Sequence, residues 1–341
     1  MNLAEAINYL ELGDAVPGLS GAVGRSEELI DRMRTALSAS GVETAMDVVA
    51  FGSLARREYT PASDVDYLVL VADMPDDPAA PRELRQRVEA ELAKEANADG
   101  ASKAPGATGL FGRATGIFDI VNQVGLEGDT NFTHTIRMEI LQESVSLLDE
   151  ELHSQILDRT LRRYITLFDV PKERPPRFLL NDMLRYWRQI TVDAQAKAPI
   201  DGKDGKAVLR YLKLATSRKN LIASSILPLI APRDISIPWE QYLKEIYAVP
   251  PLARLATVTQ NAPDEVVDAV RTIFLTIDLL VQRTDSADKR DRFKEIPWDK
   301  RKEDGGYIEL KAAADQLQLA FERIFMDWPE VADNTRRYLL L

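Results

Sequence analysis

The chain has 341 residues, enough for about two domains, and its 45% apolar and 28% charged residues are the composition of an ordinary globular protein. It has no cysteine and only two histidines, which excludes disulfides, thiolate zinc sites, iron–sulfur clusters, cysteine nucleophiles and imidazole-rich metal sites. With 43 basic and 54 acidic residues the net charge is −11, so a polyanion would have to be held by a local basic patch or by metal ions.

The first half of the sequence alternates between helical and strand patterns. Apolar residues at helical spacing predict helices over 26–39, 82–97 and 133–148. Apolar, β-prone runs predict strands over 45–51, 65–71 and 117–124. Residues 98–116 are rich in Gly, Ala and Ser and predict a loop. Strands that alternate with helices indicate an α/β domain with a small sheet.

The second half changes character. From about residue 152 the pattern is helical almost throughout, with breaks at proline-rich segments. We place the domain boundary between residues 160 and 177, and we predict a first domain of residues 1–165 and a helical domain of residues 166–341.

The sequence has no feature typical of a secreted or membrane-bound protein. Its N-terminal segment has neither a basic stretch nor a long apolar run, unlike a signal peptide. The longest apolar stretches, 222–231 and 273–281, are interrupted or too short to span a bilayer. We therefore expect a soluble cytoplasmic protein without a membrane partner.

Two aspartates open the most strongly predicted strand, within the segment FGSLARREYTPASDVDYLVLV at 51–71. Side chains two residues apart on a strand point to the same face, so Asp64 and Asp66 would lie side by side, with Cα atoms about 7 Å apart. Like charges this close are unfavourable unless a cation neutralises them, and hard carboxylate oxygens suit Mg²⁺. The pair therefore indicates a metal site.

A Gly-Ser turn precedes the aspartates. Gly52 follows a predicted strand, and glycine lets the backbone approach a phosphate closely. Ser53 begins a short helical turn whose amides would donate to that phosphate. A phosphate-binding turn beside a metal pair suits an in-line displacement at phosphorus, in which metal ions clamp the attacking and leaving oxygens.

The pattern of Gly-Ser, a ten-residue spacer and Asp-Val-Asp at the head of an apolar strand resembles the signature of the DNA polymerase β-type nucleotidyltransferase superfamily. Its residue pattern is closest to that of the bacterial glutamine-synthetase adenylyltransferases and signal-protein uridylyltransferases. It is also similar to cyclic-GMP-AMP-synthase-like enzymes and nucleotidyltransferase toxins. The resemblance implies an α/β nucleotidyltransferase domain with a small mixed sheet, followed by an all-α helical domain, with the active site in the cleft between them.

The same resemblance implies a reaction. The protein would move a nucleoside monophosphate from an NTP to an acceptor hydroxyl on a protein or an RNA 3′ end, release pyrophosphate and require Mg²⁺, with Mn²⁺ as an alternative. Gly52 and Ser53 would hold the β- and γ-phosphates, and Asp64, Asp66 and a third carboxylate would bind metal. Two other functions stay open: an oligonucleotide second-messenger synthase, whose acceptor is another NTP, and a catalytically silent NTP-binding regulator.

The third carboxylate of such enzymes lies on a neighbouring strand. Asp119 in GIFDIVNQV is the best candidate, because a charge within an apolar strand needs compensation, and we expect it to act as a general base or metal ligand. The alternative is an edge-strand aspartate that faces solvent. Asp129 in EGDTN is the second candidate, although its surroundings favour a turn.

Basic residues supply candidates for contacts with the triphosphate. Arg56 follows the Gly-Ser turn and would touch the triphosphate or the acceptor, or else lie on the surface; Glu58 has no evident role. Four residues recur on one predicted helix face, in a segment at 177–220 with ten basic and four acidic residues: Lys206, Arg210, Lys213 and Ser217. They would grip the triphosphate or the acceptor's phosphates, or form a solvated basic face.

Overall fold

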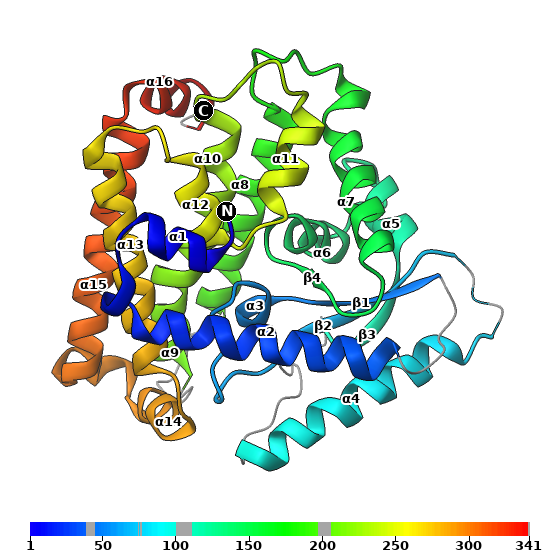
Figure 1. Ribbon diagram of the computed structural model, residues 1–341, viewed down its shortest axis with the longest axis horizontal. Helices are drawn as coiled ribbons and strands as arrows, with labels where there is room; N and C mark the ends of the chain where they lie inside the picture. The colour runs from blue at the N-terminus through cyan, green and yellow to red at the C-terminus, as the bar shows by residue number, and fades with distance from the viewer. Residues whose placement is uncertain (39–44, 74, 76, 100–110, 197–205, 340–341) are drawn as a thin grey trace. The chain divides into compact units, whose positions relative to one another are not determined.

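The computed structural model describes residues 1–38, 45–73, 75, 77–99, 111–196 and 206–339 (Figure 1). The chain divides into two compact units. The sheet unit comprises residues 22–170 and 239–244, and the helical unit comprises residues 1–21, 171–238 and 245–341. The change of unit at residue 171 falls within the predicted boundary region, while the first 21 residues belong to the helical unit.

The sheet unit carries all the strands of the described chain. Its elements are α2 (Pro17–Ser38, from Ala22 on), β1 (Met46–Ala50), α3 (Gly52–Ala55), β2 (Tyr67–Val71), α4 (Ala80–Asp99), β3 (Arg113–Gly116), α5 (Ile117–Asn122), α6 (Asn131–Gln142), β4 (Val145–Ser146), α7 (Glu150–Tyr164), η2 (Thr166–Phe168) and the start of α11 (Trp239–Tyr247). The sheet order is β3-β2-β1-β4, in which β1 is antiparallel to β2 and β4, and β2 is parallel to β3. The small mixed sheet is confirmed.

The prediction of a strand over 117–124 is wrong. Ile117–Asn122 form helix α5, and β3 lies instead at the end of the segment predicted as a loop; residues 100–110 of that segment lie outside the described chain. In α5 the buried residues are Ile117, Ile120 and Val121, which recur at helical spacing. An apolar run this short fits a helix and a strand equally well, so its pattern could not decide between them.

A hydrophobic cluster of the sheet unit lies between one face of the sheet and helices α2 and α4, and the other face of β1 and β2 is buried as well. Residues of both kinds of element form one buried cluster, including Leu29 and Met33 of α2, Val48 of β1, Val69 of β2 and Val88 of α4. Val48 pairs with Val69 across the antiparallel strands, so both side chains point to the same face. Figure 1 shows the two helices beside these strands. This packing fixes the ends of β1 and β2, between which the Gly-Ser turn lies.

A buried carboxylate connects β1 to the start of α7. Asp47 is fully buried, and its Oδ1 accepts hydrogen bonds from the Ser146 hydroxyl at 2.9 Å and from the amides of Leu148 and Asp149 at 3.2 and 2.9 Å. Burial raises the pKa of Asp47 to about 7, since these hydrogen bonds only partly offset the loss of solvation. His153 of α7 shows the opposite shift, because burial and the charge of Arg34 lower its pKa to about 4.

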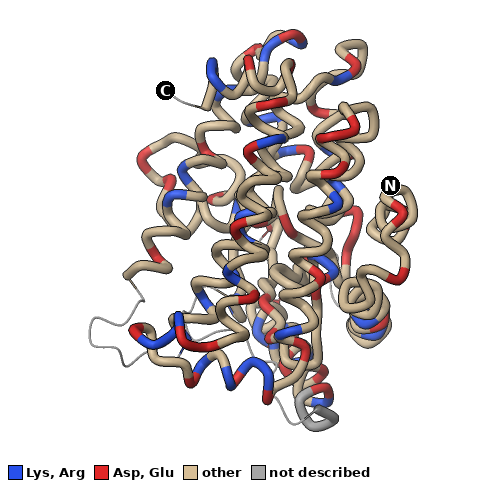
Figure 2. Tube along the Cα trace, turned by 90° about the vertical axis from the view of Figure 1, so that its left-hand side faces the viewer, with Lys and Arg blue, Asp and Glu red and all other residues tan. Residues whose placement is uncertain are grey.

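The helical unit contains the remaining elements. They are α1 (Leu3–Tyr9), η1 (Gly13–Ala15), α8 (Arg177–Ala196), α9 (Ala207–Lys213), η3 (Leu214–Arg218), α10 (Lys219–Ile230), the end of α11, α12 (Pro251–Val258), α13 (Asp264–Arg283), α14 (Ala287–Glu295), η4 (Trp298–Glu303), α15 (Gly305–Glu322), η5 (Arg323–Asp327) and α16 (Pro329–Tyr338). The segments η3 and η5 are π-helical. None of the described helices combines the length and apolar character that a bilayer span requires. Lys and Arg residues and Asp and Glu residues are interspersed over the trace (Figure 2).

We predict that Asp47→Asn changes the pH dependence of stability. Between pH 3.8 and about 7 the folded state holds a proton on Asp47 that the unfolded state has released, so ionisation of Asp47 lowers the free energy of unfolding as pH rises through this window. The Asp47→Asn variant lacks this pH-dependent decrease in the free energy of unfolding. Its free energy of unfolding, measured by urea titration, should therefore gain on the wild type by a few kcal/mol, at most about 4, between pH 4 and pH 7.

Asp31→Asn, on the exposed side of α2, is the control for loss of a surface carboxylate, and its free energy of unfolding should stay within about 0.5 kcal/mol of the wild type. In Asp47→Asn the His153 contribution remains, and it favours the folded state increasingly as pH rises from about 4 to 6.5. A pH-independent difference between Asp47→Asn and the wild type would contradict the assignment.

Candidate functional site

The Gly-Ser turn and the two aspartates meet at one end of the β1–β2 pair. Because these strands are antiparallel, the end of β1 lies beside the start of β2, and Ala50 pairs with Tyr67. The next hydrogen bond runs from the Phe51 amide to the Asp66 carbonyl, at 2.9 Å. The chain enters α3 directly after this bond, so Gly52 lies beside Asp66.

Gly52 has a backbone conformation that favours glycine. Its φ is +67°, a left-handed conformation that is unfavourable for residues with a Cβ. A Cβ placed on Gly52 would lie 3.4 Å from Oδ2 of Asp66, and no other described group approaches it within 4 Å. The absent side chain therefore leaves a space directly between the turn and the carboxylate.

The two aspartates point away from the buried cluster beneath α2 and α4. Val65 and Tyr67 are buried in the cluster beneath α2 and α4, and Asp64 and Asp66 alternate with them along the chain. Asp64 is exposed and Asp66 partly buried. The loop that leads to them is closed by Ser63, whose hydroxyl accepts from the Thr60 amide at 3.2 Å, and whose amide donates to the Thr60 carbonyl at 2.8 Å.

The carboxylate oxygens at this end of the β1–β2 pair suit Mg²⁺. In the described parts of the chain no three histidine, aspartate or glutamate side chains come together as a metal site. Mg²⁺, however, is commonly bound by one or two carboxylates together with substrate phosphates and water. Asp64 and Asp66, next to the space above Gly52, match that donor set, so the residues present fit a metal ion that arrives with a triphosphate.

Asp119 is separated from this pair. Strands β2 and β3 run parallel, with Leu68 level with Arg113 and Val71 level with Gly116. Asp66 therefore precedes the paired region and Asp119 follows it, at the opposite end of about 16 Å of strand. Asp119 is exposed on α5 rather than in a strand. The structure does not bring the predicted trio of carboxylates together.

Asp129, the second candidate for the third carboxylate, is engaged elsewhere. Its Oδ2 lies 2.8 Å from Nη2 of Arg137, and both side chains are buried. It also accepts from the Gly125 amide at 3.1 Å and the Thr133 hydroxyl at 3.0 Å. Burial alone would raise the pKa of Asp129, but these hydrogen bonds and the charge of Arg137 outweigh it and hold the pKa below its ordinary value. Asp129 is thus a structural ion-pair partner.

Arg56 is buried rather than presented to a ligand. Its Nε lies 2.9 Å from Oε2 of Glu58, and its Nη1 bonds to Oε2 of Glu143. Burial alone would lower the pKa of the Arg56 guanidinium, but the two carboxylates exceed this effect and raise it. The predicted contact with the triphosphate is therefore corrected to a buried ion pair, and Glu58, for which the sequence offered no role, is one of its partners.

The predicted basic face belongs to the helical unit. Lys206 is exposed, Arg210 and Lys213 are partly buried, and Val208, Leu209 and Leu212 on the other side of α9 pack in a core cluster. Ser217 is buried and does not continue this face. It lies in the π-helical segment η3, which follows α9 directly, and the next residue, Arg218, is partly exposed.

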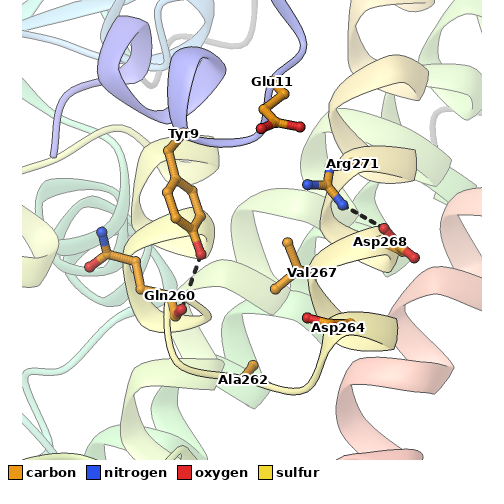
Figure 3. Close-up of a pocket in the computed structure, with 8 residues that line it drawn as sticks. All are labelled: Tyr9, Glu11, Gln260, Ala262, Asp264, Val267, Asp268 and Arg271. Atoms are coloured by element: carbon orange, nitrogen blue, oxygen red, sulfur yellow. Dashed lines mark hydrogen bonds and ion pairs between the residues drawn. The ribbon is translucent and has the colours of Figure 1, made fainter.

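The helical unit has a pocket that contains none of the predicted site residues. Its volume is about 420 Å³, and it is lined by Tyr9, Glu11, Gln260, Ala262, Asp264, Val267, Asp268 and Arg271 (Figure 3). The Tyr9 hydroxyl donates to the Gln260 carbonyl at 3.0 Å, and Arg271 pairs with Asp268 at 2.5 Å. The pocket thus combines exposed carboxylates with one arginine that is already paired.

Comparison with known proteins finds one family model that matches part of the sheet unit. Residues 30–101 match the family model described as "Nucleotidyltransferase domain". This match includes the Gly-Ser turn, both aspartates and strands β1 and β2, and it places a nucleotidyltransferase domain of the polymerase β-like superfamily in this part of the chain. A search of curated proteins found no match.

We predict that Gly52→Ala destabilises the protein, by about 1–2 kcal/mol, because a Cβ at positive φ is strained and contacts the Asp66 carboxylate. Gly24→Ala is the matched control. Gly24 is exposed on α2 with nothing within 4 Å of an added Cβ, so this change should stabilise the helix by roughly 0.5–1 kcal/mol. Urea unfolding measures both. Equal effects of the two substitutions would contradict the described conformation of the turn.

Proposed function

We propose that this protein transfers a nucleoside monophosphate from an NTP to an acceptor hydroxyl, in a reaction that depends on Mg²⁺. The observation that supports the proposal most strongly is the juxtaposition of Gly52 with the Asp66 carboxylate, two residues after the exposed Asp64. The match of residues 30–101 to a nucleotidyltransferase domain supports nucleotidyl transfer in general.

Gly52, Ser53, Asp64 and Asp66 each have a role in the proposed reaction. Gly52 lets the backbone of the turn approach the triphosphate, and the Ser53 amide and hydroxyl donate to its terminal phosphates. Asp64 and Asp66 would hold Mg²⁺, which when bound neutralises charge on the transferring phosphate. In the helical unit, Lys206, Arg210 and Lys213 stay predicted phosphate ligands, and the acceptor stays a protein or an RNA 3′ end, with a second NTP as the alternative.

A second candidate function is a catalytically silent NTP-binding regulator. It is favoured by one observation, the composition of the strand next to Asp66. By register, Phe111 lies level with Asp66, and the described residues from there to the end of β3 are Phe-Gly-Arg-Ala-Thr-Gly, without a carboxylate. A third carboxylate for activation of the acceptor is therefore absent from 111–116, while the groups proposed to bind the NTP are present.

We predict that incubation of the pure protein with each α-labelled NTP, Mg²⁺ and a cell extract transfers label to an acceptor. Asp64→Asn and Asp66→Asn should each reduce transfer by more than about a hundredfold, since loss of a group that merely supports a metal ligand already reduces activity 10- to 100-fold. Asp31→Asn, on the exposed side of α2, is the control and should retain full transfer. Asp119→Asn should also retain transfer, because Asp119 lies at the other end of the β2–β3 pair.

The labelled product distinguishes the functions. Label on a protein or RNA supports a modifying enzyme, and small linear or cyclic products support a second-messenger synthase. Binding of NTP without any labelled product supports the silent regulator. Full transfer by both Asp64→Asn and Asp66→Asn would refute the proposed site.

A further inference from the structure

The three residues that follow α3 are hydrogen-bonded to the backbone of the Gly-Ser turn. All four carbonyl oxygens of α3 accept hydrogen bonds from Arg56, Arg57 and Glu58. The Arg56 amide donates to Gly52 at 3.0 Å, the Glu58 amide to Ser53 at 2.8 Å, the Arg57 amide to Leu54 at 3.1 Å, and Nη1 of Arg57 to Ala55 at 3.1 Å. The conformation of the turn is therefore tied to the three residues after it.

Backbone strain and a buried ion pair hold these three residues in place. Arg57 has a φ of +63°, which is unfavourable for a residue with a side chain and reverses the chain after α3. Its Nε pairs with Glu27 of α2 at 2.6 Å. The Arg56 guanidinium, one residue earlier, bonds both to Glu58 of the same loop and to Glu143, the residue that ends α6. The exit of the turn is thus attached to two helices.

Burial of the ion pair formed by Arg56 with Glu58 and Glu143 has a large desolvation cost. Arg56, Glu58 and Glu143 are 7%, 5% and 3% exposed, and Oε1 of Glu58 has no hydrogen-bond partner among the described residues. Apolar residues of similar size often stabilise a buried position as well as an ion pair does, because ions lose their hydration on burial. What the charged group adds is geometry, since a guanidinium fork fixes the direction of its carboxylate partners.

We infer that Arg56 is a positioning residue for the phosphate-binding turn: through Glu58 and Glu143 it holds the amides of Gly52 and Ser53 in the orientation that receives the triphosphate. Arg56 itself does not contact the nucleotide. This inference rests on the proposed function, and it gives the sequence Arg-Arg-Glu after the Gly-Ser turn a physical role that composition and spacing did not reveal.

The test compares Arg56 with another buried arginine of the sheet unit. Arg137 is fully buried and paired with Asp129, and no hydrogen bond described for its side chain involves residues 52–58, so Arg137→Met and Arg137→Lys match Arg56→Met and Arg56→Lys. Binding of the α,β-methylene analogues of the four NTPs with Mg²⁺ is measured by calorimetry. Amide hydrogen exchange of the peptide that covers 52–58 is measured by mass spectrometry without nucleotide.

Arg56→Met should weaken the affinity at least about tenfold, because small misplacements of a positioned group have effects up to a hundredfold, and should speed exchange across 52–58. Arg137→Met should lower stability without either effect, and Arg56→Lys, which keeps the charge but not the fork, should fall between the wild type and Arg56→Met. If Arg56→Met does not fold, the two lysine variants carry the comparison.

Two results would overturn the inference while the proposed function stands: wild-type affinity and exchange in the Arg56 variants, or equal losses in the Arg56 and Arg137 variants. Failure of the wild type to bind any of the four analogues would instead count against the proposed function. In that case the exchange measurement still decides whether Arg56 holds the turn.

Discussion

The site depends on the close approach of the Gly52 backbone to the Asp66 carboxylate. The antiparallel pairing of β1 with β2 produces this approach, because the bond from the Phe51 amide to the Asp66 carbonyl places the next residue of one strand beside the side chain of the other. A left-handed φ at Gly52 then turns the chain into α3, and the missing Cβ leaves room between the turn and the carboxylate. The proposed phosphate-binding turn and the proposed metal-binding carboxylate could share one ligand only if they lie this close.

The surroundings of the corner serve to keep its geometry. On one side, α2 and α4 bury Val65 and Tyr67, so the aspartates that alternate with them point away from this buried cluster. On the other side, the loop after α3 folds back and is tied to α6 through Arg56 and Glu143. Burial of charge at Arg56 and positive φ at Arg57 are both unfavourable locally. They are tolerated because the packed sheet and helices supply the stability that the site does not.

Sequence reasoning anticipated the proximity of the Gly-Ser turn to the aspartates because the signals for it are local. Gly52, Ser53, Asp64 and Asp66 lie within fifteen residues of chain, and a strand period of two together with a turn glycine is enough to place them on one corner of a sheet. The helices predicted over 26–39 and 82–97 and the strands predicted over 45–51 and 65–71 correspond to α2, α4, β1 and β2, with shifts at their ends. The helix predicted over 133–148 corresponds to α6 only as far as Gln142, because residues 145–146 form strand β4. The small mixed sheet followed by a helical body is confirmed.

The contacts that failed prediction depend on the pairing of distant segments. Asp119 was assigned to a strand because a short apolar run fits both periods, and only the register of β2 with β3 shows that it lies at the wrong end. Arg56 resembled an exposed phosphate ligand because Glu143, 87 residues further along the chain, is invisible to a local pattern. Ser217 is buried within the π-helical segment η3 and does not extend the basic face. A search for helical spacing in the sequence assumes a regular α-helix and does not detect such a segment.

The most direct test of the central claim is a crystal structure of the protein with Mn²⁺ and a non-hydrolysable NTP analogue, with the metal located by its anomalous scattering. We predict an anomalous peak within bonding distance of carboxylate oxygens of both Asp64 and Asp66, with the terminal phosphates of the analogue against the amides of Gly52 and Ser53. A metal bound elsewhere with the triphosphate, or one bound to neither aspartate, would contradict the account.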